Sequence, residues 1–382
     1  MTGPLAGVRV LEFAGIGPGP FAGMLLADQG ADVVRLERPP SGAPAHREPR
    51  FDVMQRGKRS FGLDLRQPAG VELALELVAR ADAVIEGFRP GVMERLGVGP
   101  AECFASNPRL IFGRMTGWGQ GGPLADRAGH DINYVALSGA LYAIGRSGKA
   151  PVPPLNLVGD FGGGGLLLAF GILAALLESR GSGCGQVVDA AMVDGAALLT
   201  ALFHGMVAEG RWSDERGTNM LDSGAPYYEV YACADGQFVA VGAIEPQFYT
   251  ALLGVMGLDE TDLPPASDQS AWPELKERFG SVFATKTRDE WIALAERTDA
   301  CITPVLSFGE SPRHPHNVAR ETFVEVGGVV QPAPAPRFSR TGASSPLPPL
   351  GPGGGGRAAL LDWGVAAQRV EELARAGVVM VE

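Results

Sequence analysis

Two short segments bordered by glycines carry residue types that can transfer protons. In the first, Gly129-His-Asp-Ile-Asn-Tyr134, His130 is one of five histidines in the chain and stands where a helix is predicted to begin. A helix N-terminus disfavours the imidazolium ion, so a neutral, basic imidazole is expected at this position. The alternative interpretation is a histidine that only bonds the helix backbone.

The second segment, Asn156-Leu-Val-Gly-Asp-Phe-Gly-Gly-Gly164, places a carboxyl group beside glycines at a predicted helix start. Asp160 is equally consistent with an N-cap and with an active carboxyl group, since the glycines would leave backbone amides open to a ligand. Glu245 follows the apolar end of a predicted strand and precedes Pro246, which favours a loop side chain in a cleft. A helix-start glutamate favoured by the helix dipole is the alternative.

Five arginines each follow a predicted strand or stand near a helix end, namely Arg38, Arg59, Arg66, Arg89 and Arg95. They are expected at one rim of a sheet, where guanidinium groups suit phosphate; solvated surface charge is the alternative for any one of them. The turn Gly15–Pro20 resembles a dinucleotide-binding loop, but its prolines remove amides that would hold a pyrophosphate, so a tight turn is favoured. His314 and His316 have no third ligand nearby, and no metal site is expected.

Composition excludes several classes of function. The 382-residue chain carries a net charge of -11 without a basic tract, which argues against nucleic-acid binding. Four scattered cysteines and the absence of a recognisable secretory signal predict a reduced, cytoplasmic protein. The most apolar stretch, Leu166–Leu177, would be about 18 Å long as a helix, shorter than the ~30 Å bilayer core, so a buried helix is expected and no membrane span.

Short apolar runs alternate with segments of helical spacing over the first half of the chain. Strands are predicted at Val8–Phe13, Asp32–Leu36, Ala83–Glu86, Leu110–Met115 and Gln186–Ala190. Helices are predicted at Phe21–Gln29, Val71–Ala81, Asp131–Ala143, Leu166–Leu177 and Ala191–Gly210. This alternation predicts an α/β protein with a parallel, Rossmann-like sheet.

A second unit is expected from about Tyr227. Its strands, Tyr228–Ala232 and Phe238–Gly242, are joined by Asp235-Gly236, a hairpin signal. Helices are predicted at Gln247–Gly257, Trp272–Ala284, Arg288–Glu296 and, near the end of the chain, Ala366–Ala376. The Pro- and Gly-rich run Gln331–Gly356 is expected to be a linker or arm.

These segments together are similar to one known family. They are Val8–Pro39, Glu86–Leu96, Arg114–Gly122, Gly129–Tyr134, Pro154–Gly164, Gln186–Gly195 and Gly242–Phe248, in order over nearly the whole chain. They resemble the family III CoA-transferase fold and, within it, closely resemble the alpha-methylacyl-CoA racemases. GHDINY combined with PLNLVGDFGGG is far more specific than a lone glycine-rich loop.

The resemblance implies a large Rossmann-like CoA-binding domain at 1–200, a linker at 201–225, a smaller α/β domain at 226–330, and a return arm that completes the large domain at 331–382. It implies a homodimer of interlinked chains with each active site at their interface. His130 and Asp160 match the family's catalytic pair, and Glu245 the glutamate that orients the histidine. The CoA contacts map onto Arg38, Leu63, Asp64, Leu65, Arg66, Gly87, Phe88, Arg89, Arg95, Gly129, Asp131, Ile132, Asn133 and Tyr134.

The activity that the resemblance implies is epimerisation of 2-methyl-branched acyl-CoA thioesters, with CoA as part of the substrate and no cofactor. Inverting a carbon alpha to a thioester by 1,1-proton transfer through an enolate requires two groups on opposite sides, one basic and one acidic. We expect His130 to take the proton of the S epimer and Asp160 that of the R epimer. The Asp160 amide or the following glycines are the expected enolate donors, and Ile16, Met115 and Met220 the expected acyl contacts.

Three other functions compete with this expectation. A family III CoA-transferase would use Asp160 as a nucleophile. His130 with Glu245 favours epimerisation, because a transferase needs no base on the opposite face. A non-catalytic acyl-CoA-binding protein would keep the arginines without needing the His130, Asp160 and Glu245 set, and a nicotinamide enzyme would need the weakly matched Gly15–Pro20 loop.

Overall fold

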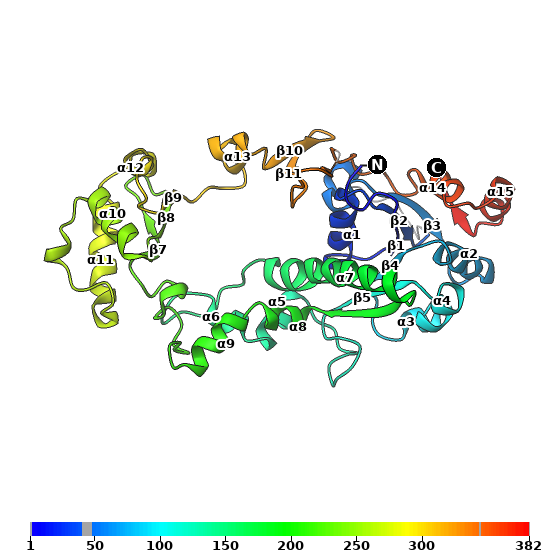
Figure 1. Ribbon diagram of the computed structural model, residues 1–382, viewed down its shortest axis with the longest axis horizontal. Helices are drawn as coiled ribbons and strands as arrows, with labels where there is room; N and C mark the ends of the chain where they lie inside the picture. Colours follow the sequence, from blue (N-terminus) through cyan, green and yellow to red (C-terminus); the bar gives the residue numbers. More distant parts are fainter. Residues whose placement is uncertain (1, 40–47, 344, 382) are drawn as a thin grey trace. The chain divides into compact units, whose positions relative to one another are not determined.

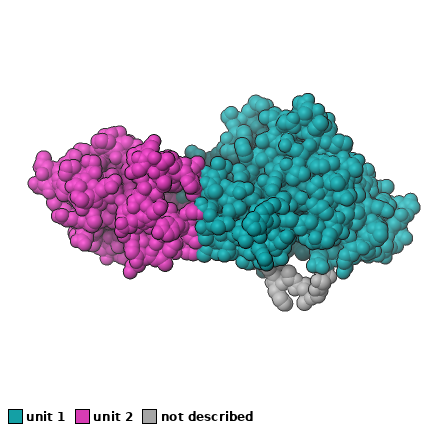
Figure 2. All heavy atoms as spheres, turned by 90° about the horizontal axis from the view of Figure 1, so that it is seen from below, with its two compact units in different colours: residues 1–138, 155–199, 316–382 teal, residues 139–154, 200–315 magenta. Residues whose placement is uncertain are grey.

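The computed structural model describes residues 2–39, 48–343 and 345–381. The chain divides into two compact units, a larger one of residues 1–138, 155–199 and 316–382 and a smaller one of residues 139–154 and 200–315. Figure 2 colours the larger unit teal and the smaller unit magenta. The larger unit is therefore assembled from three separate stretches of sequence, and the smaller from two.

A seven-stranded sheet forms the centre of the larger unit (Figure 1). Its strands lie in the order β12-β3-β2-β1-β4-β5-β6, and every neighbouring pair is parallel except β12 with β3. The bounds are β1 Arg9–Phe13, β2 Asp32–Glu37, β3 Arg59–Leu63, β4 Ala83–Glu86, β5 Ile111–Thr116, β6 Gln186–Ala191 and β12 Val379–Met380. The order 3-2-1-4-5-6 of the parallel strands is that of a Rossmann sheet, so the expected α/β class with a parallel, Rossmann-like sheet is confirmed.

Helices cover both faces of this sheet, because successive strand residues point to opposite sides. On β1, Leu11 packs into one core and Val10 into the other. The Leu11 face is covered by α2 Pro68–Val78, α3 Val92–Arg95, α4 Pro100–Ser106, α14 Gly356–Asp362 and α15 Ala367–Arg375. The Val10 face is covered by α1 Pro18–Asp28, α5 Asp131–Leu137, α7 Leu167–Ser182 and α8 Met192–Leu198.

The expected elements are mostly confirmed, with two corrections to helix length. Gly139 adopts a left-handed φ of 88°, which separates α5 from the short helix α6 Ala140–Ala143 where one helix was expected. The long helix expected over 191–210 is instead α8 and α9 Ala201–Ala208. Strands β3 and β12 were not expected, since neither has a run of alternating or continuously apolar residues long enough to predict a strand.

The apolar helix α7 continues directly from a π-helix, Leu157–Leu166, which contains Asp160. Among the described residues, Leu157–Ser182 is the one helical segment whose length and hydropathy would suffice to cross a membrane, and 39% of its apolar window is buried. One face of α7 packs into the core, while the other is exposed at Leu166, Phe170, Leu173 and Leu177. The expectation of a buried helix is therefore correct for only one face.

The smaller unit contains a three-stranded antiparallel sheet in the order β7-β8-β9. Its elements are α6, α9, β7 Tyr228–Ala232, β8 Phe238–Gly242, α10 Pro246–Met256, α11 Trp272–Phe283, α12 Arg288–Ala295 and β9 Ile302–Pro304. Tyr231, Phe283 and Trp291 pack ring against ring in its core. The expected hairpin is confirmed, with Gly236 at φ 74° in its turn.

The chain returns to the large sheet through an arm that follows α13 Pro315–Ala319 and the hairpin β10 Phe323–Val326 and β11 Val329–Pro332. Between Pro332 and α14 the described residues form neither helix nor strand, as expected for a linker or arm. The buried Arg56 holds the start of this arm, donating to Gln331 Oε1 at 2.8 Å and to the Pro332 carbonyl at 2.7 Å.

Candidate active site

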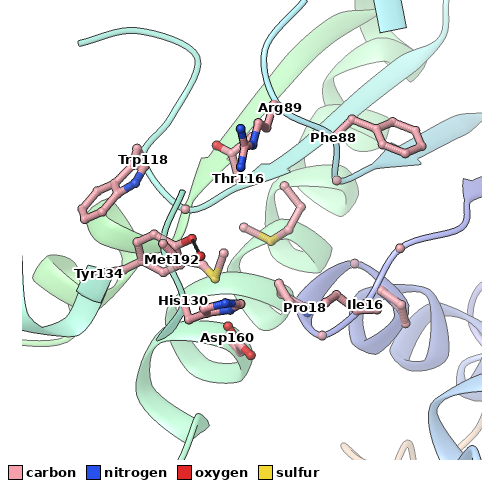
Figure 3. A pocket seen from close by; sticks show the side chains of 18 of the residues that line it. Ile16, Pro18, Phe88, Arg89, Thr116, Trp118, His130, Tyr134, Asp160 and Met192 are labelled. Atoms are coloured by element: carbon pink, nitrogen blue, oxygen red, sulfur yellow. Dashed lines mark hydrogen bonds between the residues drawn. The ribbon is translucent and has the colours of Figure 1, made fainter. Parts of the chain in front are cut away.

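A cavity of about 640 Å³ opens at the carboxyl ends of the parallel strands in the larger unit. Its walls are the turns after β1, β4 and β5, together with the start of α5 and the π-helix. A parallel α/β sheet binds ligands at this edge, because the loops that leave the strands diverge there. Figure 3 shows that His130, Asp160, Arg89 and Phe88 all belong to this one cavity.

His130 is the N-cap of α5 and is exposed. Its backbone is extended, with φ -130° and ψ 172°, and its N–H donates to Asn133 Oδ1 at 3.0 Å. Asn133 thus fixes the backbone of His130 and leaves the imidazole at the cavity. The expectation that this histidine opens a helix is confirmed.

Asp160 follows His130 by 30 positions in the sequence and lines the same cavity. It is half-buried in the π-helix. Asn156 Nδ2 donates to its Oδ2 at 3.0 Å, and Asp131 Oδ1 accepts its backbone N–H at 2.7 Å. Burial raises the pKa of Asp160, and the Asn156 hydrogen bond lowers it. The charge of Asp131 raises this pKa further, whereas the charge of His130 lowers it. The net result is a raised pKa. The arrangement therefore favours a carboxyl group that holds a proton.

The glycines after Asp160 pack the helix closely and do not line the cavity. A Cβ at Gly163 would lie 2.6 Å from the Ala196 nitrogen, and one at Gly165 would lie 2.6 Å from the Pro18 oxygen. The expected enolate donors are therefore not available as predicted, because these glycines are buried and the Asp160 amide already donates to Asp131.

The turn Gly15–Pro20 forms the wall beside Asp160, and a Cβ on Gly17 would lie 3.3 Å from Asp160 Oδ2. Buried Lys58 holds this turn by donating to the Pro20 carbonyl at 2.8 Å and to Glu12 Oε2 at 2.7 Å. Burial lowers the pKa of Lys58, and the charge of Glu12 opposes that effect. This ion pair could not be predicted from the sequence, because Glu12 and Lys58 are 46 positions apart and neither stands in a recognisable motif.

Of the five candidate arginines, Arg89 lines the cavity. Arg38, Arg66 and Arg95 are exposed after β2, after β3 and at the end of α3. Arg66 pairs with Asp64 through Nε at 2.8 Å and Nη2 at 3.0 Å, which lowers the pKa of Asp64 well below its usual range. Arg59 does not share the rim: it starts β3 and bonds Asp32 and Asp362 at the opposite edge of the sheet.

Two buried residues, Glu86 and Arg114, support the loop Gly87–Pro90 through hydrogen bonds and were not predicted from the sequence. Glu86 Oε2 accepts the Phe88 N–H at 2.8 Å, and Arg114 donates to Glu86 Oε1 at 2.9 Å. Arg114 also donates to Glu94 Oε1 on α3 at 2.7 Å. A charged residue inside an otherwise apolar buried strand, such as Arg114, is the sequence signal that would have found this network.

The remaining expected CoA contacts fall into exposed and buried sets. Ile132 and Asn133 are exposed on α5, whereas Asp131 and Tyr134 are buried, and the Tyr134 hydroxyl donates to the Gly129 carbonyl. Leu63 is buried at the end of β3, with Leu65 packed against the same core.

Glu245 lies in the smaller unit, where it is the exposed N-cap of α10 directly after β8. Met220 also belongs to that unit. Among the described residues, no group of three or more histidines, cysteines and acidic residues is arranged to hold a metal ion.

A family model described as CoA-transferase family III matches residues 5–353, a span that includes every residue lining the cavity. The chain belongs to family III of the CoA-transferases. It is an enzyme of this family, and the His130 and Asp160 segments lie inside the matched region.

Relatives within family III include enzymes of two kinds. Alpha-methylacyl-CoA racemase of Mus musculus is 50% identical over 340 residues, covering 89% of this chain and 87% of the relative. Its Homo sapiens counterpart is 49% identical over 342 residues with the same coverage. Succinyl-CoA–D-citramalate CoA-transferase of Chloroflexus aurantiacus is 32% identical over 360 residues, covering 88% of each.

A crystal structure of a CAIB/BAIF family protein from Brucella suis superimposes with a TM-score of 0.82 at 26% identity, covering 95% of this chain and 100% of that one.

Proposed function

We propose that the protein epimerises 2-methyl-branched acyl-CoA thioesters, with His130 and Asp160 as the two opposed acid/base groups. The observation that carries this proposal is that an imidazole and a carboxyl group of raised pKa line one cavity. Epimerisation needs one group that starts basic and one that starts protonated. The two relatives with about half of their residues identical to this chain are alpha-methylacyl-CoA racemases, which supports the same substrate class.

In the proposed reaction, neutral His130 removes the proton from the alpha carbon of the S epimer. The electron pair of the broken C–H bond moves toward the thioester oxygen and forms an enolate. Protonated Asp160 then gives its proton to the opposite face of that carbon. His130 is left protonated and Asp160 ionised, which is the form that accepts the R epimer and runs the same steps in reverse.

Two further groups complete the proposal. Arg89 lines the cavity, and Arg38, Arg66 and Arg95 are exposed after β2, after β3 and at the end of α3; we assign these guanidinium groups to the CoA phosphates. The family resemblance assigns to Glu245 the role of the glutamate that orients a catalytic histidine, in the way that a carboxylate orients the histidine of a catalytic triad.

A CoA-transferase reaction is the second candidate, because relatives of about 31–32% identity carry that name. In that reaction an ionised Asp160 would attack a thioester, and a raised pKa works against the ionised form. The raised pKa of Asp160 therefore supports the proposed proton-transfer role.

The test is to incubate the protein with one epimer of a 2-methylacyl-CoA in deuterated water without any acceptor acid. Epimerisation with deuterium at the alpha carbon is the expected result, measured by NMR and mass spectrometry. Absence of exchange, together with a hydroxylamine-sensitive adduct on Asp160 when an acceptor acid is added, would establish the transferase instead.

We also propose that the protein is a homodimer of interlinked chains. Exposed apolar side chains recur at helical spacing from the end of the π-helix along α7: Leu166 is 56% exposed, and Phe170 and Leu177 on α7 are 67% and 72% exposed. An apolar stripe of this kind on a folded unit marks a contact surface. The expected mass in solution by light scattering is twice that of the chain, and Leu177→Asp should weaken the dimer while Leu361→Asp, an exposed leucine of α14, should not.

A further inference from the structure

Asp131 is buried at the first position of α5, yet its carboxylate faces the segment that carries Asp160. Its Oδ1 accepts the Asp160 N–H at 2.7 Å, which joins two elements separated by 29 positions in the sequence. The family resemblance predicts Asp131 to be among the CoA contacts. The observed bond points instead to a role toward Asp160.

The neighbouring backbone is shaped to admit this carboxylate. A Cβ at Gly159 would lie 2.3 Å from Asp131 Oδ1 and 3.0 Å from Val135 Cγ2, so any larger residue at 159 would push Asp131 away. Gly159 is buried and immediately precedes Asp160. The glycine and the aspartate thus form one packed contact that fixes where the Asp160 backbone lies.

The carboxylate also carries a charge that the hydrogen bond alone does not require. An asparagine at 131 would offer the same acceptor oxygen without a negative charge. Burying the charge of an aspartate costs more free energy than burying a neutral amide. That charge lies close enough to Asp160 to act on its carboxyl group, and it opposes the effect of His130.

We propose that Asp131 is a positioning residue: its carboxylate fixes the Asp160 backbone and biases the Asp160 side chain toward the neutral acid. This inference rests on the proposed epimerisation, in which Asp160 must start protonated for one of the two substrates. Asp131 touches no reacting atom in this scheme and acts only through Asp160.

Other charged and titratable groups lie on the elements that pack against the Asp160 segment. They are His130 and Tyr134 at the start of and on α5, Asp28 on α1, Glu178 and Arg180 on α7, Asp194 on α8, Arg114 on β5 and Asp189 on β6. Of these, His130 acts on the pKa of Asp160, and Asp160 in turn raises that of Tyr134. Asp131 is the acidic group that acts on Asp160 and also bonds its backbone.

The test separates the charge of Asp131 from its hydrogen bond. Asp131→Asn keeps an acceptor oxygen and removes the charge, so the acid limb of the kcat/KM profile should move to lower pH by roughly half to one unit. Asp131→Glu keeps the charge and displaces the acceptor by one methylene, so kcat should fall about tenfold while the acid limb stays in place. The two ionisations belong to the coupled His130 and Asp160 pair, so whole profiles are compared.

Asp194→Asn is the matched control, because Asp194 is an exposed aspartate on α8, which packs against the same π-helix. It makes the same change of charge and should leave the profile unchanged. Circular dichroism melts establish that each variant is folded. If Asp131→Asn does not fold, Asp131→Glu decides the question, and a wild-type kcat in that variant overturns the inference.

A readout independent of activity keeps this inference distinct from the proposed function. The 13C resonance of the Asp160 carboxyl, assigned by its loss in Asp160→Asn, should titrate at lower pH in Asp131→Asn than in the wild type. An unchanged titration and an unchanged acid limb overturn the role of Asp131. No deuterium exchange by the wild-type protein overturns the proposed epimerisation and leaves the titration result standing.

Discussion

The two edges of the large sheet use the same residue types differently. At the amino-terminal edge, Arg59 donates two bonds of 2.8 Å to Asp32, and the Trp363 Nε1 bonds the same carboxylate at 2.7 Å. At the carboxyl-terminal edge, Arg89 and His130 are exposed at a cavity. The first edge uses its charges to join the C-terminal arm to the sheet, whereas the second keeps them available to a ligand.

Between the two edges, buried ion pairs support the cavity without facing it. Lys58 and Glu12 are 1% and 0% exposed, and they fix the turn that covers Asp160. The chemical type of a residue therefore does not decide its role in this protein. The role depends on which partner the fold places beside that residue. Changes at the cavity should therefore alter activity with little effect on stability, and changes at the buried pairs should do the reverse.

The largest expected effect is on activity at the cavity. His130→Ala and Asp160→Asn should each lower the rate of epimerisation by about a hundred- to ten-thousandfold, since inversion needs both proton-transfer groups. His130 is exposed, so its loss should leave the melting temperature nearly unchanged. Conversion of one epimer into the other and thermal melts measure the two quantities. Epimerisation within threefold of wild type in either variant contradicts the acid/base assignment.

The next effect is on stability at the buried pair. Lys58→Met should lower the free energy of unfolding by about 3–5 kcal/mol, because it leaves the buried Glu12 carboxylate without its ammonium partner. Urea unfolding followed by circular dichroism measures the loss. Lys58→Met combined with Glu12→Leu should recover most of it, since the uncompensated charge is gone. A double variant as unstable as the single one shows that packing, and not charge, causes the loss.

A smaller effect is expected on substrate binding. Arg89→Ala should raise KM for the CoA thioester about ten- to a hundredfold with a nearly unchanged kcat, because a charge-assisted hydrogen bond of about 1.5–3 kcal/mol is lost. The matched control is Arg59→Ala at the opposite edge, which should lower stability and leave KM unchanged. A raised KM in Arg59→Ala would show that the two edges are not functionally separate.

The central strands could be predicted from the sequence because their apolar residues indicate that they are buried. Strands β1, β4 and β5 are buried along almost their whole length, and at least half of the residues in each are apolar, as expected for a sheet covered on both faces. Strand β3 was missed because only Phe61 and Leu63 of its five residues are large and apolar. Its strand conformation comes from pairing with β2 and β12, which local sequence does not record.

His130 and Asp160 could be identified from their segments and from the family resemblance, but their supporting contacts could not. The Asp131 bond to Asp160 depends on how α5 packs against a π-helix, and no spacing rule predicts either. The glycines after Asp160 were expected to offer amides, and they instead permit close packing. A glycine-rich composition alone does not show whether the glycine backbone is exposed to a ligand or packed against another helix.

The smallest expected effect concerns an ion pair of the smaller unit in which Arg288 is buried and Glu310 is partly exposed. Glu310 accepts hydrogen bonds from Arg288 at 2.9 Å and from the Ser307 hydroxyl at 2.8 Å, and these lower its pKa to about 2. A lowered folded-state pKa means that the unfolded chain binds a proton first as pH falls, so this stabilisation is present above pH 4.5 and is lost toward pH 2. Glu310→Gln should therefore lower the melting temperature slightly at pH 7 and leave it almost unchanged relative to wild type near pH 2.

Because the Glu310 side chain is partly exposed, salt screens its charge and the difference should shrink further when salt is added, unlike the loss in Lys58→Met. Melting temperatures of both variants at pH 2, 4.5 and 7, in low and high salt, make the comparison direct. A Glu310→Gln deficit that persists at pH 2 would mean that the glutamate acts through its shape and hydrogen bonds. The distinction drawn here between buried and exposed charge pairs would then fail for the smaller unit, while the separation between the two edges of the large sheet would be unaffected.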